Sequence, residues 1–349
     1  MQLVNNQCKG QICLSWWLDL IIILAVILHN HAHQCVTSVI NNLANLPVAV
    51  SGLALGTAGI GNVLAIEVHS NLRYVCAAIA ALILLVVTIK KLAHPGLLWR
   101  EISHPVLGSF IPAFDMCLMV LADIIANFSL LSGQILWYFA IVLHLVFATS
   151  FIYHRIRDFD LNHMLPSWYV PPVGIVVACV TGSNMHAPII TQVIFYLGFV
   201  LYCGMLPVMM YRLVFGDRIN DAQLPSFAIM GAPASLCLAG YLTAFSNPNP
   251  MIVGFLLALA LMMTSLVYIS VIRINAFRIA FIPIYASFTF PMAIGSTALI
   301  KYSHYIGINS DAGQFWHVIG VIEMTAAVVV ISWVLVKMTK VVTKNVILA

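Results

Sequence analysis

Long apolar runs alternate with short polar segments along the chain, and this pattern predicts a series of membrane-spanning helices. About 20 consecutive apolar residues in a helix are enough to cross the hydrocarbon core of a bilayer. Ten runs of suitable length cover residues 47–66, 72–92, 105–126, 132–154, 168–185, 189–213, 225–244, 250–273, 279–300 and 315–337. We therefore expect an all-α integral membrane protein, with one ten-helix domain at residues 47–337 and a short basic tail at 338–349.

Prolines recur in the odd-numbered runs at intervals of about sixty residues. They are Pro47, Pro112, the pair Pro171 and Pro172, Pro233 and Pro291. A proline inside a helix removes a backbone hydrogen bond and bends the helix. Irregular backbone at membrane depth is tolerated only where it is buried in protein or lines a cavity. The pattern therefore predicts five kinked inner helices around a central path, with five straighter outer helices facing lipid.

Small residues accompany these prolines and suggest a repeated unit. The third, seventh and ninth runs each place small residues around a central proline, and the first run carries several glycines instead. Such residues let helices approach closely in lipid. The simplest architecture is a helical hairpin repeated five times about an axis along the membrane normal.

Composition restricts the class of protein. The chain is 62% hydrophobic and 7% charged, whereas soluble domains carry about 25% charged residues. It contains eight cysteines but no CxxC pair, so zinc or redox chemistry has little support and we expect no cofactor. A membrane enzyme would need a metal set or a Ser–His pair within the spans. Because the histidines lie mainly in loops, an enzyme is a remote alternative.

Basic residues are distributed unevenly between the two sets of connecting segments. One side collects Lys90, Lys91, Arg100, Arg155, Arg157, Arg212, Arg218, Arg273, Arg278, Lys337, Lys340 and Lys344. The other side holds Arg73 and Lys301. Since cytoplasmic loops are enriched in Lys and Arg, we expect the crowded side to be cytoplasmic. Both ends of the ten-helix core then face the cytoplasm, in the inner or plasma membrane.

Residues 1–46 form a leader that fits no single interpretation. The apolar run Ser15–Leu28 is interrupted by Asp19 and is short for a span. A signal peptide, an interfacial helix and an atypical translation start remain open. The segment that follows contains His29, His31, His33 and Cys35. Their alternating spacing matches no common metal site, so a polar turn beside the membrane is favoured over metal ligation.

Five stretches carry a family resemblance. They are LPVAVSGLALGTAGIGN (46–62), HPVLGSFIP (104–112), WYVPPVGIVVA (168–178), FAIMGAPASLCLAGYL (227–242) and SFTFPMAIGSTALIKY (287–302). In this order the chain resembles the tellurite-resistance/dicarboxylate transporter family over residues 46–340. That family includes bacterial TehA, fungal malate and sulfite carriers, and the plant slow-type anion channels.

The resemblance implies five helical hairpins whose odd helices line a pore, with one pore in each subunit of a homotrimer. It also implies an aromatic plug at Phe290, directly before Pro291. A ring beside a kink can block a narrow neutral pore, and moving it away opens the pore. The alternative is that Phe290 is ordinary core packing. The residues that we expect to line or kink the pore are Gly56, Pro112, Asp115, Pro172, Gly231, Pro233, Ser287, Thr289 and Pro291.

The middle of the odd runs contains no Lys or Arg. Anion attraction would then come from helix ends, amides at kinks and the basic cytoplasmic mouth. In principle, Pro112 frees the carbonyl of Gly108 and Pro233 frees that of Ile229. A neutral pore of this kind would pass anions that lose water easily.

Asp115 is an acidic residue within an odd run, at a position where the resemblance implies a small polar residue. A carboxylate near mid-membrane is a candidate functional residue, and in a protonated form it could couple anion transport to protons. The favoured alternative is a side chain turned from the pore and bonded to a hydroxyl, since the sequence shows no basic partner. We expect His144 to be a hydrogen-bonded core histidine, Asp123 to make a structural hydrogen bond and Glu323 to pair between helices or subunits.

These observations together predict transport of small anions through an aromatic-gated pore. The anions would be inorganic ions or C4-dicarboxylates, with a link to tellurite resistance implied by the resemblance. The alternative is a proton-coupled dicarboxylate or anion carrier that uses Asp115. The expected partners are the small anion, the lipid bilayer and two further copies of the chain, and no nucleic acid.

Overall fold

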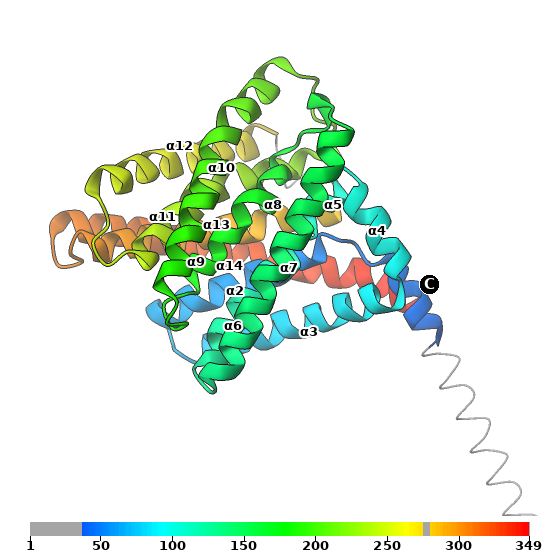
Figure 1. Cartoon of the computed structure of the whole chain (residues 1–349), viewed down its shortest axis with the longest axis horizontal. Coiled ribbons are helices and arrows are strands. Elements are labelled where there is room, and N and C mark those ends of the chain that lie inside the picture. Colours follow the sequence, from blue (N-terminus) through cyan, green and yellow to red (C-terminus); the bar gives the residue numbers. More distant parts are fainter. Residues whose placement is uncertain (1–36, 275–279, 349) are drawn as a thin grey trace, which may run out of the picture.

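The structure is a computed structural model that describes residues 37–274 and 280–348 (Figure 1). Within these ranges every regular element is a helix, and nine helical segments are long and apolar enough to cross a bilayer. A shorter apolar segment, Pro166–Val180, lies where the fifth run was predicted. The predicted all-α membrane fold is therefore confirmed. Most of the leader at residues 1–46, including the histidine segment, lies outside the described residues.

Each hairpin consists of an inner span followed by an outer helix that packs against it. The inner spans are α2 (Val50–Glu67), α5–α6 (Leu107–Phe110 and Ala113–Ala126), η3–α8–η4–α9 (Pro166–Tyr169, Val170–Val173, Gly174–Val176 and Val177–Val180), η5–α11 (Leu224–Gly231 and Ala232–Ala244) and η7–α13 (Pro283–Phe288 and Thr289–Tyr305). The outer helices are α3 (Leu72–Ala93), α7 (Leu130–Arg157), α10 (Pro188–Phe215), α12 (Pro250–Ile274) and α14 (Asp311–Val342). Short helices α4 (Pro95–Ser103), η1 (Leu43–Asn45), η2 (Leu161–His163) and η8 (Thr343–Ile347) complete the described chain.

The five inner spans form a closed ring in chain order. Helix α2 contacts α6, α6 contacts α9, α9 contacts α11, α11 contacts α13, and α13 returns to α2. The outer helix α14 packs against α2 as well as against α13. At the closure, the Asn42 side chain donates a hydrogen bond to the carbonyl of Val346 at 3.3 Å, and Figure 1 shows the C-terminal end beside the start of the chain's first described segment.

Burial separates the two sets of helices. In the four long inner spans 61% to 78% of positions are buried, whereas in the outer helices 22% to 39% are. Large apolar side chains such as Leu82, Val142, Val200 and Val329 are more than half exposed on the outer helices. A helix that is apolar all round with an exposed outer face is suited to contact with lipid. The predicted inner ring and outer ring are therefore both present.

Four inner spans are broken near their prolines, whereas the outer helices are continuous. The first inner span, α2, was predicted to be kinked but is one unbroken helix, because Pro47 lies before its first residue. Three inner spans begin with a 3₁₀ segment, and Pro112 caps the N-terminus of α6. The carbonyls of Gly108 and Ile229, expected to be free, instead accept the N–H groups of Ile111 and Ala232. A 3₁₀ turn makes this possible because it bonds residues three apart. Helix α10 stays helical across Pro207.

The two ends of the ring differ in their connections. At one end lie the turns within each hairpin, residues 68–71, 127–129, 181–187, 245–249 and 306–310. We call this the hairpin end. At the other lie the connections between hairpins and the residues Lys90, Arg155 and Arg212, and we call it the basic end. The irregular halves of the inner spans are at the basic end, and their α-helical halves are at the hairpin end.

Close contact between α2 and α13 depends on a glycine. A Cβ atom placed on Gly56 would lie 2.4 Å from the Cβ of Thr289 and 2.7 Å from its backbone carbonyl carbon. The Thr289 hydroxyl bonds the carbonyls of Gly52 at 3.0 Å and Ala286 at 2.7 Å. A side chain at position 56 would therefore push apart the two spans that close the ring.

We expect Gly56→Val to destabilise the protein by about 1–3 kcal/mol, the usual cost of overpacking a core. Thermal unfolding of the purified protein in detergent measures this change. Gly254→Val on α12 is the matched control, because a Cβ there meets nothing within 4 Å. Equal melting temperatures for the two variants would contradict the packing account.

Candidate functional site

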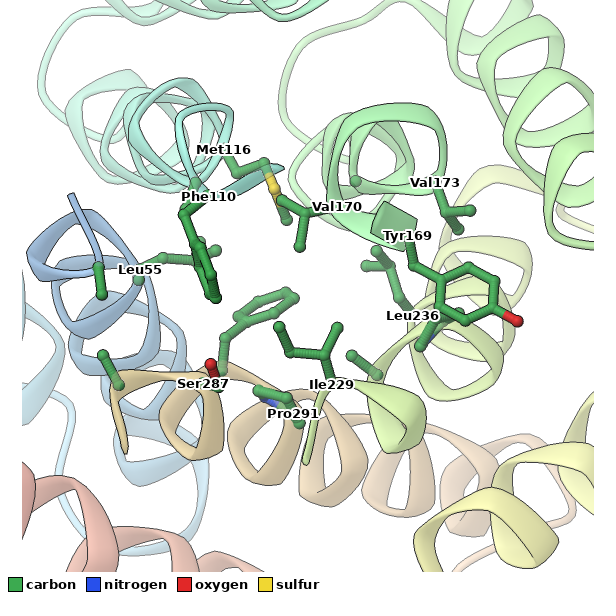
Figure 2. A pocket seen from close by; sticks show the side chains of 18 residues that line it. Leu55, Phe110, Met116, Tyr169, Val170, Val173, Ile229, Leu236, Ser287 and Pro291 are labelled. Carbon is green, nitrogen blue, oxygen red and sulfur yellow. The ribbon is translucent and has the colours of Figure 1, made fainter. Parts of the chain in front are cut away.

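Two cavities lie one after the other inside the ring of inner spans. The cavity in the basic half has a volume of about 50 Å³ and an almost wholly apolar lining. Figure 2 shows side chains from all five inner spans converging on it, while the Tyr169 hydroxyl points away. A space this small and apolar has room for a few water molecules but offers them few partners. We call it the apolar cavity.

The cavity in the hairpin half is larger and contains charged groups. Its volume is about 280 Å³, and its polar lining comprises Asn62, Arg73, Asp123, Thr181, Ser183, Asn184, Thr297 and Lys301. Several of these residues lie next to the hairpin turns, so this cavity is near the hairpin end. We call it the polar cavity.

Phe290 and Leu236 line both cavities and therefore lie between them. Phe290 is in the first turn of α13, and Leu236 is in α11, the neighbouring inner span. On the other side of α13, a Cβ on Gly59 of the neighbouring span α2 would be 3.7 Å from the Phe290 ring. This is an ordinary contact distance, so the Phe290 ring packs against α2 at Gly59.

Four of the predicted pore residues face the apolar cavity: Pro233, Ser287, Phe290 and Pro291. Ser287 contributes a buried hydroxyl with no hydrogen-bond partner within the described residues. In Figure 2 Ser287 lies beside Pro291 at the edge of the space. The cavity is therefore bordered by one buried hydroxyl from the ninth run, set among apolar side chains.

The other predicted pore residues do not line either cavity. Gly56 and Thr289 face each other in the contact between α2 and α13. Pro112 and Pro172 lie at breaks whose neighbours, such as Ala113 and Val173, line the apolar cavity instead. The remaining two are Gly231, which lines a separate space of about 250 Å³ with Tyr268 and Glu323, and Asp115.

Other lining residues were not singled out from the sequence. Phe110, Tyr169, Ile229 and Leu236 all face the apolar cavity. The only signal for Phe110 is its position just before the Pro112 break, and Leu236 is one apolar residue among many in its span. Their place on the lining depends on helix rotation within the ring, which hydropathy does not specify.

Asp115 has a basic partner, contrary to the sequence-based expectation of a hydroxyl. Its carboxylate is fully buried and bonds Nδ1 of His144, which is also fully buried. The other ring nitrogen, Nε2, is 2.9 Å from the carbonyl of Pro171. His144 is 29 residues away on α7, so only the packing of α7 against α6 brings the pair together. The prediction of a hydrogen-bonded core histidine is confirmed.

The hydrogen bonds of His144 fix the number of protons in this pair. A carbonyl oxygen only accepts, so Nε2 carries a hydrogen and donates it to Pro171. Nδ1 and the carboxylate oxygen of Asp115 then share a further proton. The pair joins three elements, because Asp115 is in α6, His144 is in α7 and Pro171 is in the broken span α8. It holds an outer helix onto the break in an inner span.

Three cations at the basic end make structural contacts. Lys90 bonds Glu101 at 2.6 Å and the carbonyl of Leu46 at 2.8 Å. Arg212 donates to the carbonyls of Asp217 at 2.7 Å and Asn162 at 3.0 Å. Buried Arg155 donates to the carbonyl of Ser103. These side chains hold loops in place, whereas the buried ammonium of Lys91 has no hydrogen-bond partner within the described residues and lies 4.0 Å from the centre of the Phe114 ring.

His104 lies beside Arg155 at the same end. Burial, together with the neighbouring Arg155 and His163, lowers the pKa of His104 below its ordinary value. Its Nδ1 accepts the N–H groups of Val106 at 3.1 Å and Leu107 at 3.3 Å. A neutral ring is needed for this acceptor role, and it caps the start of the third span.

A closed ring of inner membrane spans around stacked cavities defines a protein that carries solutes across a membrane. The chain matches the voltage-dependent anion channel family over residues 45–339 and belongs to that family. The resemblance found in the five stretches of sequence is thereby confirmed.

Two curated relatives are transporters. An uncharacterized transporter from Methanocaldococcus jannaschii is 28% identical over 168 residues, which are 44% of this chain and 49% of the relative. A second from the same organism is 27% identical over 161 residues, 42% of this chain and 46% of the relative. The chain thus matches about half the length of each.

We expect His144→Leu to destabilise the protein by about 3 kcal/mol or more, because it leaves the Asp115 carboxylate buried without its partner. Replacing both residues, as Asp115→Leu with His144→Leu, should recover at least half of this loss. Unfolding in detergent measures all three variants. His317→Leu is the control: its ion pair with Glu67, at 2.9 Å, is partly exposed, and its loss should cost under about 1 kcal/mol. A double variant no more stable than His144→Leu would contradict the pairing account.

Proposed function

We propose that this protein conducts small anions through a path inside each subunit, and that the Phe290 ring closes this path. The observation that supports the proposal most is the position of Phe290 between the apolar and polar cavities. Membership of an anion channel family supplies the class of solute.

The proposed closure has a simple physical basis. An ion that moves from the polar cavity into the apolar cavity would lose water and gain almost no polar contacts, which is costly. Hydrophobic constrictions of this kind close pores by excluding water. Removing the ring would join the two cavities and widen the narrowest region. Selectivity would then favour anions that lose their water easily.

The finer parts of the proposal concern substrate, assembly and orientation. We propose small inorganic anions or C4-dicarboxylates as substrates, with tellurite resistance as an indirect consequence of transport. The protein would act as a homotrimer, each subunit with its own pore. The concentration of Lys and Arg at the basic end supports a cytoplasmic location for that end in an inner or plasma membrane.

Phe290→Ala tests the gate. We expect nitrate or chloride flux into proteoliposomes to rise at least about tenfold over the wild type, because the blocking side chain is gone. The flux should follow the anion's own gradient. Phe288→Ala is the matched control, since Phe288 is equally deep on the same span but lines neither cavity of the ring.

Two results would count against the gate. One is unchanged flux in Phe290→Ala with normal expression and melting temperature. The other is an equal rise in Phe288→Ala, which would indicate general loosening of the span. Either result would leave Phe290 as ordinary packing.

A proton-coupled carrier is the second candidate, supported by the proton that Asp115 and His144 share. Asp115 itself lines neither cavity, although its neighbour Met116 faces the apolar one. If the protein is a carrier, a pH gradient will drive anions uphill in proteoliposomes, and Asp115→Asn will abolish that movement. Uphill movement that keeps its pH dependence in Asp115→Asn would exclude Asp115 as the coupling group.

A further inference from the structure

The two basic residues of the hairpin end meet at one place. Arg73 is in α3 and Lys301 is in α13, yet both line the polar cavity. They are the two cations that the sequence places on this side of the ten spans. Their common location indicates that the polar cavity, and not the surface around it, carries the positive charge of this end.

Arg73 is largely neutralised. It forms an ion pair with Asp123, whose other carboxylate oxygen accepts the side-chain amide of Asn184 at 3.1 Å. The Nε–H of Arg73 has no partner within the described residues, and neither has the side-chain oxygen of Asn62, which lines the same cavity. Both atoms are buried, so neither is open to the cavity.

Lys301 is not neutralised in this way. Among the described residues its ammonium makes no hydrogen bond and no ion pair within 4.0 Å, although Asp123 is near enough to act on it electrostatically. At the basic end, Lys90 bonds a carboxylate, Arg155 and Arg212 bond loop carbonyls, and the ammonium of Lys91 lies over the rings of Phe114 and Phe147. Two cations and one carboxylate leave a net charge of +1 on the polar cavity (Arg73 and Lys301 +2, Asp123 −1).

We infer that the polar cavity is a docking site for one monovalent anion, with Lys301 as its main counter-charge. This inference rests on the proposed function and adds to it the charge class of the substrate. A volume of about 280 Å³ admits an anion with part of its water shell. The anion would thus be held before the dry region at Phe290, where water must be lost.

The carboxylate of Asp123 sets the preference for a single charge. A divalent anion would exceed the net charge of the cavity and would lie close to Asp123. Asp123→Asn would raise the net charge from +1 to +2, and it would favour divalent anions such as sulfate. Lys301→Gln would lower the net charge from +1 to zero. The two substitutions therefore change anion binding in opposite directions, which loss of structure alone does not do.

The first experiment measures binding without transport. The purified wild type is titrated with nitrate and with sulfate at constant ionic strength, and thermal stabilisation reports occupancy. We expect Lys301→Gln to raise the half-saturating nitrate concentration about fivefold or more, and Lys301→Arg to stay within about twofold of wild type. Asp123→Asn should gain sulfate binding. Lys337→Gln, an exposed cation on α14 at the basic end, should leave both titrations unchanged.

A nitrate titration that is the same in Lys301→Gln and in the wild type would overturn the inference. So would a loss in Lys301→Arg as large as that in Lys301→Gln, since the charge is kept. The same variants in the flux assay separate this site from the proposed function. Binding with the expected pattern but no anion flux in Phe290→Ala would reject conduction and keep the site. Anion flux whose concentration dependence is the same in Lys301→Gln and in the wild type would keep conduction and reject the site.

Discussion

A bilayer supplies no hydrogen bonds to the backbone, and this constraint determines how the chain can be built. Every carbonyl and N–H at membrane depth needs a partner within the protein. Four of the five inner spans break near their prolines, but 3₁₀ turns bond the carbonyls that the breaks would free, as at Gly108 and Ile229. The outer helices are continuous and keep lipid away from the breaks. The irregular inner spans therefore need the surrounding ring of outer helices.

Polarity changes along the axis of the ring. The polar cavity holds charged groups, whereas the apolar cavity has almost wholly apolar walls, with the buried hydroxyl of Ser287 at its edge. An ion would pass from a charged space to a dry one within a few ångströms, and the side chains between them are Phe290 and Leu236. A path of this kind binds an anion weakly in its narrow part. Weak binding is what conduction requires, because the ion must also leave.

Much of the fold could be predicted from the sequence because its determinants are local. Apolar runs specify spans through their length, and prolines such as Pro112 and Pro233 break a helix wherever they occur. The uneven distribution of Lys and Arg between the connecting segments likewise distinguishes the basic end from the hairpin end. Phe290 was reached through the resemblance, since nothing local distinguishes it from the other phenylalanines. The shortness of the fifth span was missed: the predicted run 168–185 extends five residues past Val180 into Thr181, Gly182, Ser183, Asn184 and Met185, which are mostly polar or small and lie in the hairpin turn.

The candidate site was less predictable because it depends on contacts between distant segments. Asp115 seemed to have no basic partner, yet His144 reaches it from the neighbouring helix. Leu236 has no local mark, and its position between the cavities follows from the rotation of α11. The same is true of Lys301: only the folded arrangement shows that no described residue forms an ion pair or hydrogen bond with its ammonium. The sequence predicts which helices are inside, and the packing determines which face of each helix meets the path.

The closed ring also has a consequence for how the chain could be rewired. Residues near 42 and 346 meet, and α14 packs against α2 just as α3 packs against α6 and α10 against α11. The five hairpins are therefore arranged in a circle, and the position of the covalent break in that circle is not dictated by packing. A circularly permuted chain that joins these two points and opens at another connection between hairpins would keep the same helix contacts. Covalent order and spatial order are separable in this fold.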